Sequence, residues 1–181
     1  MALHPGRYEL HGRITLRTSR DGLAAQAGHD LTIDVGRWSG GLVIGADLAP
    51  VSLDVRANLG SLVVRAGTGG IKPLTDRDRR EILATAGKVL SVDRHPEAKF
   101  TASSFSQTGD DGVIDGTLTL AGQGRPLRLQ VRRSEPDRFL ATTTVRQTSF
   151  GIKPYSGFLG ALKVSDDVAV EVEVGLTPAS G

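Results

Sequence analysis

The clearest pattern in the chain is the alternation in Val168-Ala169-Val170-Glu171-Val172-Glu173-Val174, where every second residue is a valine. Successive side chains of a β-strand point to opposite faces, so a period of two predicts a strand with one apolar face. The last strand of the protein is therefore expected to be half buried.

The same period of two recurs from one end of the chain to the other. Apolar residues alternate with others in segments 8–16, 31–35, 42–46, 51–57, 100–102, 114–120, 127–131 and 139–145. About eight strands without a βαβ rhythm exclude a doubly wound fold and favour a sandwich or a closed barrel. Because closure leaves no exposed edge, we expect a mainly all-β protein whose antiparallel strands close into a barrel. The interior of such a barrel holds its own side chains or one small ligand.

One segment, from Thr75 to Leu90, follows a helical period instead. Its apolar residues fall on a single stripe, formed by Ile82, Leu83, Ala86, Val89 and Leu90. Thr75, followed three positions later by Asp78, resembles a capping box. We expect one amphipathic helix near residues 75–90, packed against a flank of the barrel or across one of its mouths.

Composition limits the functional classes. The length of 181 residues suits one domain, placed at residues 1–181 with a core of about 7–176. The 22 basic and 20 acidic residues nearly cancel and aromatic residues are few, so nucleic acid is not an expected partner. The absence of cysteine excludes disulfides and Cys-based metal sites. The first residues lack the features of a secretory signal, so the cytoplasm is the expected location.

His29 and Asp30 are the most obvious candidates for acid–base chemistry, because a carboxylate can orient an imidazole. Neighbouring residues of a strand point to opposite faces, however, so these side chains are not expected to act on each other. We assign His29 to the barrel mouth or to contact with a ligand head group. The four histidines show no metal-ligand spacing, and Ser156 lacks the glycine two residues ahead that a nucleophile elbow requires. No catalytic residue, metal or cofactor is expected.

The main basic cluster consists of Arg125, Arg128, Arg132 and Arg133. Guanidinium groups suit a diphosphate, so an anion site is one interpretation. The alternation of residues 127–131 turns Arg128 away from Leu127 and Leu129, and this favours a solvated outer face.

Segment 150–162 is apolar, aromatic and rich in glycine, and it is too irregular for a strand. Two interpretations stay open. The loop plugs the core, or it lines the entrance with Phe158 and Leu159 touching a ligand.

Six short motifs occur in order between about residues 7 and 174. They are Gly28-His29-Asp30-Leu31-Thr32-Ile33 with Trp38-Ser39-Gly40-Gly41, Ser52-Leu53-Asp54-Val55, Pro96-Glu97-Ala98-Lys99-Phe100-Thr101-Ala102-Ser103, Gly116-Thr117-Leu118-Thr119-Leu120-Ala121-Gly122 with Arg125-Pro126-Leu127, Ser149-Phe150-Gly151-Ile152, and the stretch from Val164 to Val174. Together they resemble the YceI-like family of polyisoprenoid-binding proteins. The resemblance implies a lipocalin-like antiparallel barrel with a hydrophobic pore for a long isoprenoid chain, and no catalytic machinery. One departure is Ala121, where family members often carry histidine.

The barrel pattern and the resemblance together predict a non-catalytic carrier that holds a polyisoprenoid or similar long lipid in its lumen. The expected lining residues are Leu31, Ile33, Leu53, Phe100, Leu118, Phe150, Ile152, Tyr155, Phe158, Leu159 and Val170. They depend on the register, since a slip of one residue exchanges the two faces of a strand. Transient membrane contact and a homodimer are both compatible with the sequence. The alternatives are a protein-interaction or stress-related barrel with a filled core, and an enzyme acting on an isoprenoid lipid.

Overall fold

The computed structural model describes residues 3–160 and 162–180, apart from the side chain of Phe158, and consists mainly of β-strands. The strands are β1 (Gly6–Thr18), β2 (Arg20–Asp21), β3 (His29–Val35), β4 (Trp38–Ile44), β5 (Pro50–Asn58), β6 (Leu62–Gly69), β7 (Glu97–Thr108), β8 (Asp111–Leu120), β9 (Gln123–Glu135), β10 (Arg138–Arg146), β11 (Ser156–Gly157), β12 (Leu162–Val164) and β13 (Asp167–Pro178). The helices are α1 (Asp76–Val89) and the short 3-10 turns η1 (Ala25–Ala27), η2 (Leu59–Ser61), η3 (Gln147–Phe150) and η4 (Phe158–Gly160). Within the described ranges, no helix has the length and apolar character needed to cross a membrane.

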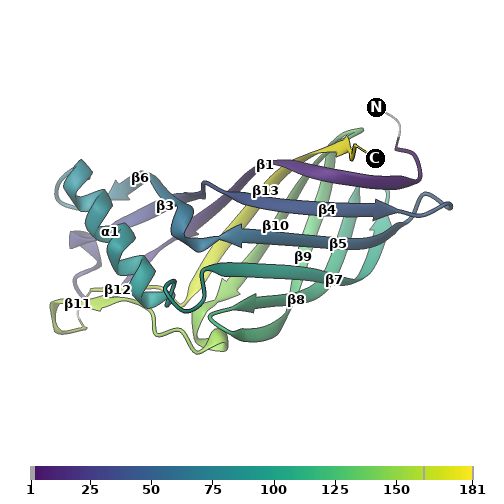
Figure 1. Ribbon diagram of the computed structural model, residues 1–181. Helices are drawn as coiled ribbons and strands as arrows, with labels where there is room; N and C mark the ends of the chain where they lie inside the picture. Colours follow the sequence, from purple (N-terminus) through teal and green to yellow (C-terminus); the bar gives the residue numbers. More distant parts are fainter. Residues whose placement is uncertain (1–2, 161, 181) are drawn as a thin grey trace.

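Eight of these strands close into an antiparallel barrel (Figure 1). Neighbouring strands follow the order β1, β4, β5, β7, β8, β9, β10 and β13, and β13 then pairs with β1. The closing ladder joins ten residue pairs, from Tyr8 and Pro178 to Arg17 and Ala169. The alternating valines of β13 thus lie beside β1, and the expected closed barrel is confirmed.

Gly12 marks the point at which β1 changes one of its neighbours. Residues 6–9 pair with β4, whereas residues 15–18 pair with β3. The register with β13 runs unbroken through Gly12, so this glycine forms a corner and not a bulge. Its φ is +141°, and an added Cβ would collide with the backbone carbonyl of Glu173. Only glycine suits this position without strain.

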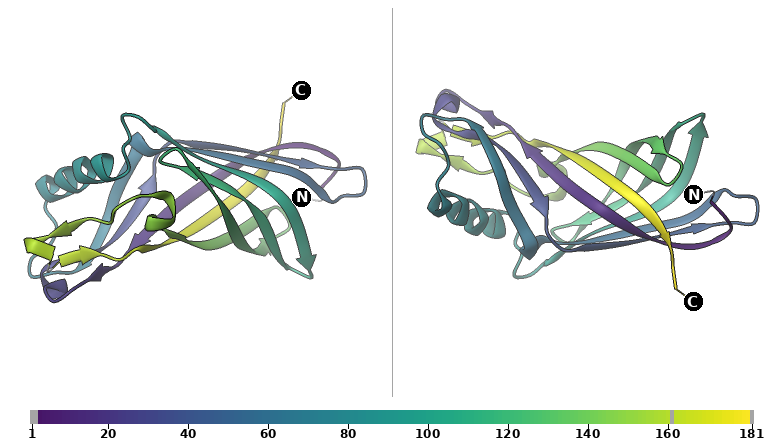
Figure 2. Two further views of the ribbon diagram at one scale, coloured as in Figure 1. Left: turned by 90° about the horizontal axis from the view of Figure 1, so that it is seen from below. Right: turned by 90° about the horizontal axis from the view of Figure 1, so that it is seen from above.

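Strands β3 and β6 extend the wall at one end of the barrel, where α1 also lies (Figures 1 and 2). The Thr75 hydroxyl accepts a hydrogen bond from the N–H of Asp78, and the Asp78 carboxylate accepts one from the N–H of Thr75. This capping box and the helix that follows confirm the expectation for residues 75–90. The guanidinium of Arg79 donates to the carbonyl of Val64 at 2.6 Å and so ties α1 to β6.

A small three-stranded sheet lies at the same end of the molecule (Figure 2). In it, β12 pairs with both β11 and β2. The expectation that segment 150–162 is too irregular for any strand was therefore wrong. Because β2 lies far away in the sequence, the local pattern could not reveal this pairing.

The buried apolar residues form a shell around an internal space. Most of them fall into three separate clusters, which include Ile14, Phe150 and Tyr8 respectively. Even the most buried of them, such as Phe150, keep 3% of their surface exposed. Leu127 and Leu129 face the inside of the barrel but are only half-buried. Side chains of a solid core would be covered more completely, so the lumen is not filled by the protein itself.

Replacing Gly12 by alanine should test the corner that permits closure. We expect the free energy of unfolding to fall by at least about 2 kcal/mol, because strained backbone costs about 1–3 kcal/mol and the Glu173 carbonyl must also move. Gly87→Ala in α1 is the matched control, since its Cβ would meet no atom within 4 Å. That control should gain about 1 kcal/mol from the higher helix propensity of alanine. Urea unfolding measures both, and an unchanged Gly12→Ala protein would contradict the corner.

Candidate ligand-binding site: the barrel cavity

The inward side chains surround an elongated cavity of about 1380 Å³. Its wall runs from α1 and the small sheet at one end to the β4–β5 and β7–β8 hairpins at the other (Figure 1). Pockets for drug-sized ligands typically measure about 300–1,000 Å³. The cavity therefore suits a longer molecule than an ordinary small metabolite.

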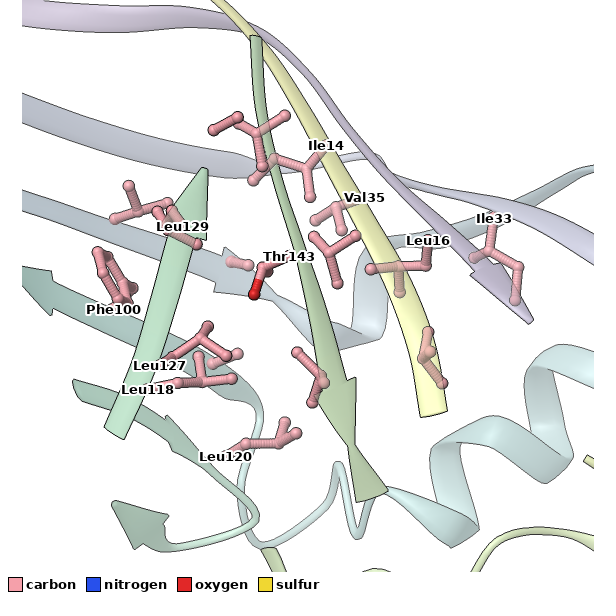
Figure 3. A pocket seen from close by; sticks show the side chains of 18 of the residues that line it. Ile14, Leu16, Ile33, Val35, Phe100, Leu118, Leu120, Leu127, Leu129 and Thr143 are labelled. Atoms are coloured by element: carbon pink, nitrogen blue, oxygen red, sulfur yellow. The ribbon is translucent and has the colours of Figure 1, made fainter. Parts of the chain in front are cut away.

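The middle of the cavity is almost entirely apolar (Figure 3). Strands β1 and β3 contribute Ile14, Leu16, Ile33 and Val35, and strands β7, β8 and β9 contribute Phe100, Leu118, Leu120, Leu127 and Leu129. Strand alternation explains this wall, because each inward leucine of β9 is followed by an outward polar residue. The middle of the lumen thus presents mainly hydrocarbon to a ligand.

Arg128 shows the outward side of the same alternation. Its guanidinium binds the Asp115 carboxylate with hydrogen bonds of 2.7 and 3.0 Å on the exposed surface. These hydrogen bonds hold the pKa of Asp115 below its usual value. Arg128 is thereby engaged outside the barrel and is not aimed at the lumen.

Two polar side chains in the cavity wall have partners within the protein. The hydroxyl of Thr143 donates to the carbonyl of Arg128 at 2.7 Å. The side-chain amide of Gln147 donates to the carbonyl of Ser165 at 3.0 Å. Because these groups are already hydrogen-bonded, they do not require a polar ligand beside them. Among the residues that the structure describes, no cluster of His, Cys, Asp and Glu could hold a metal ion.

His29 lies on the rim at the α1 end. Its Nε2 donates to the carbonyl of Lys72 at 2.7 Å, since a carbonyl oxygen can only accept. Asp30 has a different partner, the backbone N–H of Arg20, at 2.9 Å. The two neighbours therefore do not form a His–Asp dyad.

Charged residues distinguish the two ends of the cavity. The α1 end carries Arg20, Lys72 and Lys163 together with Asp78 and Glu81, whereas the opposite end carries Asp47, Asp110 and Asp111 together with Arg133. Hydrogen bonds from Thr75 lower the pKa of Asp78, so this carboxyl is negatively charged at neutral pH. The α1 end has an excess of cations, and the opposite end has an excess of carboxylates.

Most of the residues singled out from the sequence lie on the cavity wall. They are His29, Leu31, Ile33, Leu53, Phe100, Leu118, Ile152, Tyr155 and Val170. Contact between these residues and a ligand stays a prediction.

Two of the residues predicted to line the cavity, Phe150 and Leu159, are not part of that wall. Phe150 is 3% exposed and belongs to a buried cluster with Leu59 and Leu120, because η3 takes the chain out of the strand alternation. Leu159 is 108% exposed and lies in η4 with a φ of 55°, so it projects into solvent and not into the lumen. The side chain of Phe158 lies outside the described residues. Segment 150–162 therefore packs into the core at Phe150, lines the cavity with Ile152, Tyr155 and Leu162, and exposes Leu159.

Sequence reasoning did not single out several wall residues, including Val131, Arg133 and Thr143. The alternation that places Leu127 and Leu129 inward also reaches positions 131 and 133, so this signal was present in the sequence. The α1 residues Ile82, Ala86 and Val89 also line the cavity. Their helical stripe was visible, but the part of the barrel that it faces was not.

A closed antiparallel barrel around a long apolar cavity defines the class of this molecule, which is a lipocalin-like barrel. Residues 11–176 match the model of the YceI-like domain, from the middle of β1 to the end of β13. The chain therefore belongs to the YceI-like family.

Relatives and solved structures agree with this assignment. The UPF0312 protein ECA1782 of Pectobacterium atrosepticum is 34% identical over 58 residues, which are 32% of this chain and 30% of that protein. The match thus spans less than a third of the relative's length. BcnA of Burkholderia cenocepacia has a TM-score of 0.65 at 12% identity, covering 91% of this chain and 95% of the other.

Two further solved structures show the same likeness. The Campylobacter jejuni YCEI protein has a TM-score of 0.60 at 14% identity, covering 82% of this chain and 85% of the other. A polyisoprenoid binding domain from Saccharophagus degradans, implicated in plant cell wall breakdown, has a TM-score of 0.58 at 14% identity, covering 95% and 98%. At these identities the structures show a shared fold.

A tryptophan at position 131 should block the lumen. We expect Val131→Trp to bind the neutral fluorescent probe N-phenyl-1-naphthylamine at least tenfold more weakly, because the indole occupies space in the cavity. Gln130→Trp places the same side chain one residue away on the exposed face and should leave the affinity unchanged. Fluorescence titration measures both variants, and equal affinities would show that the probe does not bind in the cavity.

Proposed function

We propose that the protein is a non-catalytic carrier that holds a long apolar lipid, a polyisoprenoid or a similar chain, inside the barrel. The observation that carries this proposal is the continuous apolar wall of a cavity of about 1380 Å³. The name of the Saccharophagus degradans relative, a polyisoprenoid binding domain, supports the same class of ligand.

The energetics favour exchange with a membrane over capture from water. Moving about 40 carbons out of water at about 0.8 kcal/mol per methylene would nominally yield about 30 kcal/mol. Noncovalent affinities do not exceed about 21 kcal/mol, so water is the wrong reference state for such a ligand. Transfer from a bilayer into an apolar lumen is closer to balance, and this allows both loading and release.

Exposed aliphatic side chains at the two ends of the barrel support transient contact with a bilayer. Leu23, Ile71 and Leu159 are 101%, 78% and 108% exposed and belong to loops at the α1 end. Leu48 and Val51 are 56% and 63% exposed at the opposite hairpin. The same side chains could instead contact a second copy of the chain, in keeping with a homodimer.

The cavity and its rim weigh against the alternative functions. A barrel that serves only as an interaction module needs no lumen wider than its own side chains. An enzyme acting on the lipid would need a reactive constellation, but the rim histidine and its neighbour Asp30 have separate partners. We therefore place binding ahead of catalysis.

Protein purified from its native host should carry a lipid with a long apolar chain, which extraction and mass spectrometry would identify. After removal of that lipid, the protein should bind prenols with an affinity that rises with chain length until the cavity is filled, because each added unit buries more apolar surface. The prenols should be recovered chemically unchanged. A lipid-free chain without affinity for any prenol would contradict the proposal, and turnover would establish the enzyme instead.

A further inference from the structure

Arg133 is a cationic side chain in the wall of a largely apolar cavity. It lies two residues after Val131 on β9, so it continues the inward face that Leu127 and Leu129 begin. The adjacent Arg132 faces outward, where its Nε lies 3.1 Å from the Asp111 carboxylate. The two neighbouring arginines thus occupy opposite faces of one strand.

The guanidinium of Arg133 is held in place but is not fully hydrogen-bonded. Its central carbon lies 5.8 Å from the centroid of the Phe139 ring, and its Nη2 donates to the carbonyl of Pro136 at 2.9 Å. Its Nε is buried and has no hydrogen-bond partner. Within the described part of the chain, it is the one buried side-chain nitrogen or oxygen atom in that state.

An unpaired buried donor on a cation is costly, and native proteins satisfy nearly all such groups. The cation–π contact with Phe139 and the hydrogen bond to Pro136 hold the guanidinium in place and leave Nε as a donor without an acceptor. A planar guanidinium forms its strongest hydrogen bonds with carboxylate and other oxygen acceptors. Because protein atoms cover Nε, a ligand oxygen at this end of the cavity would bind the Nη groups of the guanidinium, and a small shift of the side chain would bring Nε into the same contact.

We propose that the cavity binds an amphiphile whose apolar tail lies along the lumen and whose carboxylate or carbonyl oxygen binds Arg133. This inference rests on the proposed lipid-binding function and adds the class and orientation of the ligand. The head group lies at the end formed by the β4–β5 and β7–β8 hairpins, and the tail points towards α1 (Figure 1).

The surrounding charges restrict the head group further. Asp47 and Asp110 line the same end of the cavity as Arg133, whereas the carboxylate of Asp111 is paired with Arg132 on the outer face. A head group with several negative charges, such as a diphosphate, would be repelled by the carboxylates of Asp47 and Asp110. One negative charge or a neutral carbonyl matches a single guanidinium better.

Three ligands with the same isoprenoid tail test this assignment: farnesene without a head group, farnesoic acid and farnesyl diphosphate. Their ability to displace N-phenyl-1-naphthylamine from the purified, lipid-free protein gives their affinities. We expect farnesoic acid to bind at least tenfold more tightly than farnesene and more tightly than farnesyl diphosphate. Equal binding of farnesoic acid and farnesene by the unmodified protein would overturn the role of Arg133 without any variant. Tightest binding of the diphosphate would overturn the assigned class of head group.

Two arginine variants locate the effect. Arg133→Met should remove the advantage of farnesoic acid over farnesene and leave the affinity for farnesene within about twofold, while Arg133→Lys should restore part of that advantage. Arg132→Met, the matched control on the outer face, should behave as the unmodified protein. If the acid keeps its advantage in Arg133→Met, the inference fails while the lipid-binding function stands. If the unmodified protein binds neither the probe nor any of the three ligands, the proposed function itself fails.

Discussion

The backbone ladder between β1 and β13 converts a long antiparallel sheet into a barrel. It joins the first and last long strands over ten residue pairs, and it therefore ties the two ends of the chain together. The ladder stays in register through Gly12, where a side chain would strike the Glu173 carbonyl. On one side of this glycine β1 pairs with β4, and on the other side it pairs with β3, while it remains beside β13 throughout.

Closure also determines what the inward side chains can do. In an open sheet, the apolar face must pack against another layer. In this barrel the inward faces of the strands turn towards one another, and their branched side chains do not reach across the lumen. The result is a cavity of about 1380 Å³ with an apolar wall. A long-chain ligand can supply the van der Waals contacts that the wall side chains do not make with one another. The polar and charged groups are concentrated at its two ends, where water or a head group can reach them.

The sequence allowed much of the candidate site to be predicted, but not its limits. Leu31, Phe100 and Val170 follow strand alternation and lie on the wall. Phe150 was expected there as well, yet it packs behind the wall because a 3-10 turn interrupts the alternation before it. Arg133 was grouped with the solvated arginines because its charge outweighed its position in the pattern. Position on the strand, and not polarity, decided which way its side chain points.

The chain by itself determined the period-two strands and the capped helix at residues 76–89, because these features depend on local geometry. It also determined the membership of the YceI-like family, which depends on motifs in a fixed order. Only the tertiary structure decided which strands meet, where β1 changes partner, how β2 joins β12, and which donor at the cavity wall lacks an acceptor. These features depend on pairing between residues far apart in the chain. Such pairing follows from twist, register and closure of the whole sheet, which no short window of sequence contains.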